Sequence, residues 1–146
     1  QQTSPTGPTA TLQPSGPTPT VTLAPVTTDL ELIYNATSLT VLNASGRALD
    51  LSTLAFQGSQ VGFAARGWTQ VVDVPLAAFP NGHCLQLQVS GSAQVSPQQC
   101  RFIRSIVQLG TGRAFWTQGS FDVLLNGLPV ATCPANMTRC AVTVPR

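Results

Sequence analysis

Short apolar runs separated by turn residues dominate the chain from Leu30 onward, and no segment keeps a helical repeat of apolar residues over three turns. Runs rich in Val, Ile, Leu, Thr and Phe between clusters of Gly, Asn, Ser and Pro are typical of β-strands. The pattern therefore predicts an all-β domain. Strands are expected over residues 30–34, 38–43, 54–57, 69–74, 84–89, 102–109, 121–125, 128–132 and 141–144.

The clearest local signal is Asn126-Gly127, which separates two apolar runs near the C-terminus. Asn-Gly in this setting favours a hairpin, because both turn residues must adopt a positive φ. Residues 121–125 and 128–132 are predicted to form this hairpin, and residues 141–144 are expected to complete a three-stranded meander. Nine short strands in about 118 residues favour an immunoglobulin-like β-sandwich, and a β-barrel is the alternative.

The first 28 residues differ sharply in composition from the rest. Residues 1–28 contain nine Thr, six Pro and no charged residue, whereas residues 29–146 carry all twelve charged residues. The prolines exclude a helix and favour extended chain, and stretches rich in Thr and Pro are often O-glycosylated stalks. We therefore predict an extended tail over residues 1–28 and a β-sandwich domain over residues 29–146.

Polar and apolar residues alternate in Thr20–Val26, the most apolar part of the tail. Val21 and Leu23 share one face of an extended chain, and prolines limit the length of strand that can pair. The tail can reach about 85 Å, well beyond a domain with a radius of gyration of about 14 Å. We expect Val21, Leu23 and Val26 to form an intersubunit strand. Docking of the tail on its own domain is the alternative.

Four cysteines in a chain of this size, with one Met and few charged residues, indicate an oxidising compartment. No CxxC motif or paired His is present, so the spacing does not match a zinc site. Of three possible connectivities we favour Cys84–Cys100 and Cys133–Cys140, since each closes a short loop between candidate neighbouring strands. Four buried free thiols are the alternative. We expect an extracellular or cell-surface protein, without metal or cofactor, and a mature product whose leader has been removed before Gln1.

Residues with catalytic chemistry are few: one His, one Glu, four Asp and no Lys. His83 has no partner at motif spacing and is expected on a surface turn, and Asp50 is interpreted as a turn cap before Leu51. The Asp residues form no calcium loop, and a glycosidase pair would require two of them to converge. A net charge of +2 without a basic stripe argues against nucleic acid, and no apolar run of about 18 residues could span a membrane. We expect no enzyme.

Two kinds of surface site are candidates for contacts with glycans or ligands. Trp68 follows Arg66-Gly67 in a loop-like stretch, and an Arg beside an exposed Trp is a ligand-contact pair, whereas aromatic residues on strands are expected in the core. Asn35, Asn43 and Asn136 each begin a sequon and are candidates for glycosylation. Tail threonines are the expected glycan sites if the source is bacterial.

The stretch Leu39–Phe56 resembles the opening of lamin-tail-type domains: a strand ending in Asn, a polar turn with Gly, then Leu-Asp-Leu-Ser and alternating large apolar residues. Residues 75–87 are similar to a later element of that family, in which Pro and Gly precede an apolar strand. Leu54 stands where the family usually has Trp, and the cysteines are not part of its pattern. The whole chain is also similar to stalked membrane-protein ectodomains of filamentous green bacteria. These resemblances imply an immunoglobulin-like sandwich with an extracellular binding or structural role.

We therefore expect a non-enzymatic structural subunit of a surface filament or layer, whose sandwich receives the tail of the next subunit. Its partners are other copies of itself, together with covalently attached glycans. The alternative is a stalked ligand-binding ectodomain, including a carbohydrate-binding one, with Trp68 and Arg66 near its site. A filament subunit sediments as a polymer, whereas a binding module stays monomeric.

Overall fold

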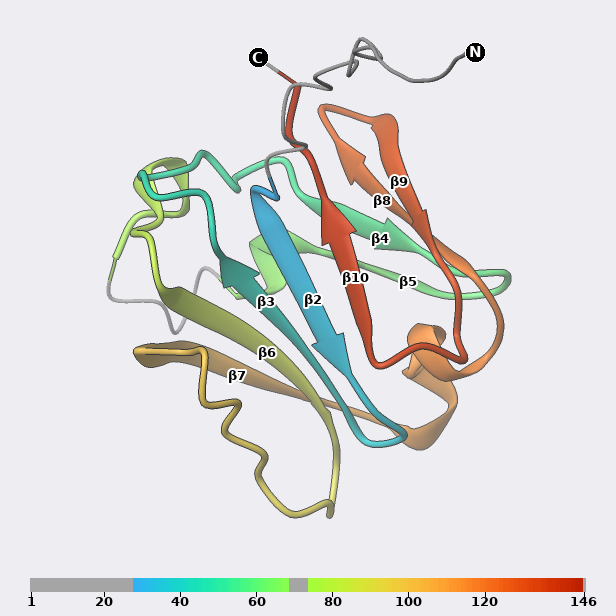
Figure 1. The fold of residues 1–146 in the computed structure, drawn as a ribbon. Helices are drawn as coiled ribbons and strands as arrows, with labels where there is room; N and C mark the ends of the chain where they lie inside the picture. Colours follow the sequence, from blue (N-terminus) through green and yellow to red (C-terminus); the bar gives the residue numbers. More distant parts are fainter. Residues whose placement is uncertain (1–27, 69–73, 146) are drawn as a thin grey trace, which may run out of the picture.

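The computed structural model describes residues 28–68 and 74–145. The intersubunit strand predicted at Val21, Leu23 and Val26 lies outside the described residues, as does most of the strand predicted over 69–74. The described ranges contain nine strands and four short 3₁₀ turns, and the strands form two sheets (Figure 1). No helix in these ranges is long and apolar enough to cross a membrane. The all-β prediction is confirmed for the described part of the chain.

The larger sheet has five strands, with β2 and β3 near its centre. Their antiparallel register pairs Leu30 with Asn43 and Tyr34 with Leu39. Alternate residues of β2 face the core and are buried. The strand order is β10 (Arg139–Val142), β2 (Leu30–Tyr34), β3 (Ser38–Asn43), β6 (His83–Val89) and β7 (Phe102–Leu109).

The smaller sheet has four antiparallel strands and contains the predicted hairpin. Asn126 and Gly127 adopt φ values of 53° and 77°, as a type I′ turn requires, and Leu125 pairs with Leu128 across them. The prediction of this hairpin is confirmed. The short strand β5 was not predicted, because a three-residue strand shows no alternation to detect. The strand order is β5 (Gly62–Ala64), β4 (Ala55–Gln57), β8 (Phe121–Leu125) and β9 (Leu128–Cys133).

The prediction of a C-terminal three-stranded meander is wrong. β10 leaves the sheet of β8 and β9 and pairs with β2, with Val142 opposite Leu30 and Arg139 opposite Ile33. The loop between β9 and β10 therefore passes from one sheet to the other, and the disulfide Cys133–Cys140 joins the two sheets at this corner. The loop carries no two-residue hairpin turn, so local sequence does not determine which strand β10 pairs with.

β6 and β7 are neighbours, but they run parallel. A parallel pair requires a crossover of about a dozen residues, which residues 90–101 supply. The disulfide Cys84–Cys100 attaches the end of this crossover to the beginning of β6. Two buried side-chain amides hold it to the outer face of the sheet: Gln86 Nε2 donates to Val95 O and Gln88 Nε2 donates to Ala93 O, both at 2.8 Å.

The core between the sheets is built around aromatic rings. Phe56 stacks on Phe115 with ring centroids 5.4 Å apart and makes edge contacts with Trp68 and Phe121 at 6.4 and 6.3 Å. All four side chains are buried, and each fully buried ring of this size contributes roughly 1.5–3 kcal/mol. Phe102 is the exception among the strand aromatics, since it is 55% exposed at the start of β7.

The two disulfides are the same pairs that the spacing favours, and removing them should destabilise the domain by different amounts. The sequence separations are 16 for Cys84–Cys100 and 7 for Cys133–Cys140. Loop-closure entropy then gives a loss of about 3 kcal/mol for the first and about 2.5 kcal/mol for the second. Chemical denaturation of the double Cys→Ser variants measures both losses. Peptide mapping without reduction checks the pairing, and a Cys84–Cys133 linked peptide would contradict it.

Candidate functional site

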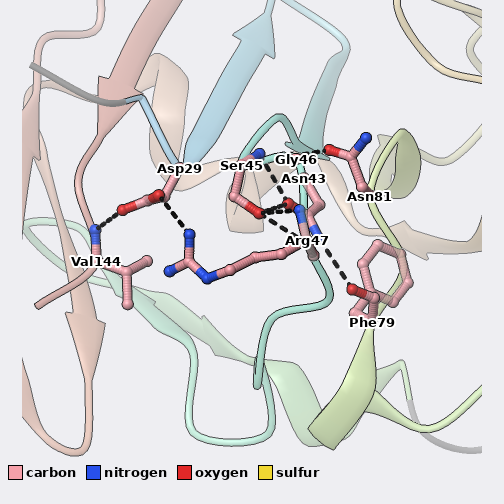
Figure 2. A network of polar contacts seen from close by, with 8 residues as sticks. All are labelled: Asp29, Asn43, Ser45, Gly46, Arg47, Phe79, Asn81 and Val144. Atoms are coloured by element: carbon pink, nitrogen blue, oxygen red, sulfur yellow. Dashed lines mark hydrogen bonds and ion pairs between the residues drawn. The ribbon is translucent and has the colours of Figure 1, made fainter. Parts of the chain in front are cut away.

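Asp29 lies between residues 1–28 and β2 in the chain, and it is held on both sides. Its N–H donates to Val142 O and its carbonyl accepts from Ala44 N, both at 2.9 Å. Its fully buried carboxylate accepts from Val144 N at 2.7 Å through Oδ2 and lies 3.4 Å from Arg47 Nη1 through Oδ1 (Figure 2). We call this set of contacts the tail clamp. It fixes the start of β2, the chain after β10 and the loop after β3 at one point.

Asn43 completes this network and uses every hydrogen-bonding position of its side-chain amide. Nδ2 donates to Arg47 O at 2.8 Å and to Phe79 O at 2.9 Å. Oδ1 accepts from Ser45 N at 3.0 Å and from Ser45 Oγ at 2.7 Å (Figure 2). Because Asn43 is also fully buried, no glycan can be accommodated there in the folded domain. The structure thus removes Asn43 from the predicted glycosylation candidates and gives its amide a role in the fold.

An apolar groove of about 320 Å³ lies beside the tail clamp, and we call it the proximal groove. Val144, which bonds to Asp29, forms part of its wall, and Leu128 is 67% exposed at its rim. The Asp50 carboxylate accepts from Ser52 N and Ser52 Oγ, and these bonds lower the pKa of Asp50. Asp50 is therefore the turn cap that the sequence predicted. The groove is lined by Asp50, Thr53, Leu125, Asn126, Leu128, Val130, Val144 and Pro145.

A second groove, of about 280 Å³, lies where β2 ends, and we call it the distal groove. Its two large rings have their polar atoms bonded to backbone: Tyr34 Oη donates to Pro134 O at 2.5 Å, and Trp116 Nε1 donates to Asn35 O at 2.8 Å. Met137 is 55% exposed at its rim. No lining residue carries a charge; the lining consists of Tyr34, Asn35, Ala36, Trp116, Thr117, Ala135, Asn136, Met137 and Thr138.

The two grooves lie at opposite poles of the molecule. β2 begins at Leu30, next to the tail clamp, and ends at Tyr34 in the wall of the distal groove. Four residue steps of a strand span about 14 Å. Figure 1 shows the start of β2 and the end of β10 at one pole, and the loop between β9 and β10 at the other. The described part of the chain therefore begins at the pole opposite the distal groove.

The two remaining sequons meet at the distal groove. Asn35 and Asn136 are both exposed, and both line it although they are 101 positions apart in the chain. Asn35 Oδ1 also accepts from Thr37 N at 2.8 Å and from Ser38 N at 2.9 Å, so it caps the turn between β2 and β3. Either side chain is accessible to modification in the folded domain. Their proximity depends on the pairing of β10 with β2, which the sequence pattern did not predict.

The prediction that Trp68 is an exposed ligand contact is wrong. Its ring is fully buried, lies 4.8 Å from the Phe63 ring in an edge contact, and donates from Nε1 to Gln86 O at 3.0 Å. Arg66 is exposed beside it, but the indole it was expected to accompany belongs to the core. The 3₁₀ turn Ala65–Gly67 directs the Trp68 side chain inward, and Gly67 leaves room for the Phe63 ring.

His83 is not on a surface turn as predicted. It is the first residue of β6, is only 9% exposed, and accepts at Nδ1 from Arg104 Nε at 2.9 Å. The carboxylates do not converge either: Asp29 belongs to the tail clamp, Asp50 caps a turn, and Asp122 accepts from Thr132 Oγ1 at 2.7 Å across the β8–β9 ladder. Asp73 lies outside the described residues. Among the residues the structure describes, no three His, Cys, Asp or Glu side chains gather to hold a metal ion.

No protein-family model, curated protein or solved structure matches the chain.

Replacing Asn43 should destabilise the domain, whereas replacing the exposed sequon residue Asn136 should not. Asn43→Ala removes four hydrogen bonds from a buried site, so we expect a loss of about 1–3 kcal/mol in the free energy of unfolding. Asn136→Ala is the matched control and should lie within about 0.5 kcal/mol of the wild type. Denaturant unfolding measures both variants. Equal stability of the two would contradict the structural role of Asn43.

Burial raises the pKa of Tyr34 above its ordinary value, so the folded domain retains the phenol proton more tightly than the unfolded chain does. The contribution of Tyr34 to stability is therefore full below about pH 10 and is lost as the pH rises through the raised pKa. Tyr34→Phe loses the bond to Pro134 O, about 0.5–1.5 kcal/mol at neutral pH, together with this alkaline dependence. Unfolding at pH 7 and pH 11 measures both. An alkaline loss that is unchanged in Tyr34→Phe would contradict this assignment.

Proposed function

We propose that the chain is a non-enzymatic extracellular structural subunit of a surface filament or layer. Its N-terminal extension docks on a neighbouring copy, and the apolar residues Val21, Leu23 and Val26 make the contact. The domain is then both the anchor of one extension and the acceptor of another. Glycans on the tail threonines, Asn35 or Asn136 are further covalent partners.

The observation that carries this proposal is the way the extension is anchored. The tail continues directly into β2, which pairs with β10 on one edge and with β3 on the other. Asp29 adds backbone bonds to both neighbours and a side-chain bond to Val144. Tension on the extension would therefore load two ladders and the tail clamp together. This supports a role in which neighbouring molecules are held together through the extension.

The proposal also includes an extracellular location and a finer fold class. Two disulfides and a composition with only twelve charged residues support an extracellular setting. We infer an immunoglobulin-like sandwich, related to lamin-tail domains, because the segment that carries the resemblance falls on corresponding elements. Leu39–Asn43 lies in β3, the polar turn is the Asn43 network, and Phe56 is at the centre of the core.

A second candidate is a stalked ligand-binding module, and the position of the distal groove favours it. A domain carried on a stalk presents to other molecules the pole that lies farthest from the stalk. The extension leaves at the tail clamp, and the distal groove opens at the other end of β2. In this alternative the groove would take a ligand other than the tail of a second copy.

Replacing Val21 and Leu23 with Asp should abolish assembly and leave the domain folded. A charged side chain cannot fill an apolar site without a large desolvation cost. Sedimentation of the full chain measures assembly, and circular dichroism checks the fold. The matched control is Thr9→Asp with Thr11→Asp, which adds the same charge to the tail outside the Thr20–Val26 segment and should assemble. A wild-type chain that stays monomeric at every concentration would contradict the proposal and leave the stalked module in its place.

A further inference from the structure

We propose that the distal groove is the acceptor for the Thr20–Val26 segment of a neighbouring copy. This inference rests on the proposed assembly through the extension and names the surface that receives it. Assembly then proceeds head to tail, with the tail pole of one molecule against the distal pole of the next.

The geometry of the poles favours this acceptor over the proximal groove. The proximal groove shares Val144 with the tail clamp, so donor and acceptor would lie at the same pole. Two molecules meeting by that pole would exchange tails reciprocally and close into a two-fold pair. A contact between opposite poles is heterologous and repeats without closing, as a filament or layer requires.

The short connection between the donor segment and its own domain restricts the arrangement further. Val26 lies three positions before Asp29, so the chain between them spans at most about 11 Å. The donor segment therefore starts immediately outside its own tail clamp. A neighbour that receives it must bring its distal groove close to that clamp, which stacks the two domains pole to pole.

The chemistry of the distal groove matches that of the tail. Residues 1–28 carry no charge, and neither does any residue that lines the distal groove, whereas the proximal groove includes Asp50. Tyr34 and Trp116 are almost fully buried beneath the groove, with their polar atoms bonded to backbone. The exposed side chains of Ala36 and Met137 supply the apolar surface that an occupant would meet. Met137 is unbranched and flexible at the rim and can adapt to Val or Leu side chains.

The rim also offers partners for the polar face and the backbone of an extended segment. Asn and Thr side chains at the rim can bond to the threonines that alternate with Val21 and Leu23. Thr138 leads directly into β10, an edge strand of the five-stranded sheet in the described residues. An extended segment that leaves the groove there can add ladder bonds to this edge.

The test compares two exposed apolar residues at opposite poles in the full chain. Met137→Asp places a charge at the distal groove and should raise the concentration needed for assembly at least tenfold in sedimentation. Leu128→Asp places the same charge at the proximal groove and should assemble as the wild type does. Circular dichroism and the melting temperature check that both variants fold.

A complementation experiment separates loss of the acceptor from misfolding. The Met137→Asp variant keeps a competent tail, and the Val21→Asp/Leu23→Asp variant keeps a competent distal groove. At a concentration at which neither variant assembles alone, a mixture of the two should form a one-to-one complex. Failure of the mixture to form this complex would overturn the assignment.

The remaining outcomes distinguish this inference from the proposed function. Loss of assembly in Leu128→Asp alone would assign the acceptor to the proximal groove and overturn the inference. Normal assembly of both variants would place the acceptor elsewhere and overturn it while the proposed function stands. A monomeric wild type would contradict both proposals. If the tail of that monomer were protected from proteolysis, and Met137→Asp abolished the protection, the tail would dock on its own molecule.

Discussion

The pairing of β10 with β2 is the contact on which the arrangement of this domain depends. It places the last strand beside the first described one, so that Val142 lies opposite Leu30 and Asp29 can bond to Val144. Because of this pairing, the disulfide Cys133–Cys140 connects the two sheets instead of two strands of one hairpin. The start of β2 and the end of β10 consequently share one pole. The loop between β9 and β10 is left to shape the other pole.

The strands and the hairpin could be predicted because their signals are local. Short apolar runs between turn residues predicted the bounds of β2, β3, β7 and β8 as the structure has them, and Asn126-Gly127 predicted the turn. The partner of β10 and the parallel direction of β7 could not be predicted, since both depend on long connections that carry no turn motif. The sheet assignment in turn decides which residues meet, so the approach of Asn35 to Asn136 was also beyond the sequence pattern.

The burial of several polar residues could not be predicted from the sequence either. Asp29, Asn43 and Gln86 look like surface residues in the sequence, yet each is fully buried and bonds to the backbone of a loop or crossover. The sequence signal of Asp29 and Asn43 is weak, because a polar residue at the end of an apolar strand also fits a solvated turn. Gln86 lies within β6, where a polar residue also fits a solvent-facing strand position. Trp68 shows the converse case. Its neighbours Arg66 and Gly67 indicate a loop in the sequence. The Trp68 indole is nevertheless buried because it donates from Nε1 to Gln86 O in β6, a contact that depends on the tertiary structure.

If the distal groove is the acceptor, a glycan at its rim would compete with docking, and the three sequons would then have different consequences. A glycan on Asn35 or Asn136 would stand at the edge of the distal groove and exclude an extended segment from it. A molecule modified there could still offer its own tail to a neighbour, because the tail clamp lies at the opposite pole. It would therefore end a head-to-tail array at its distal pole, while its tail could still dock on the next molecule. Asn43 takes no part in this competition, since its amide is already committed to Arg47 O and Phe79 O.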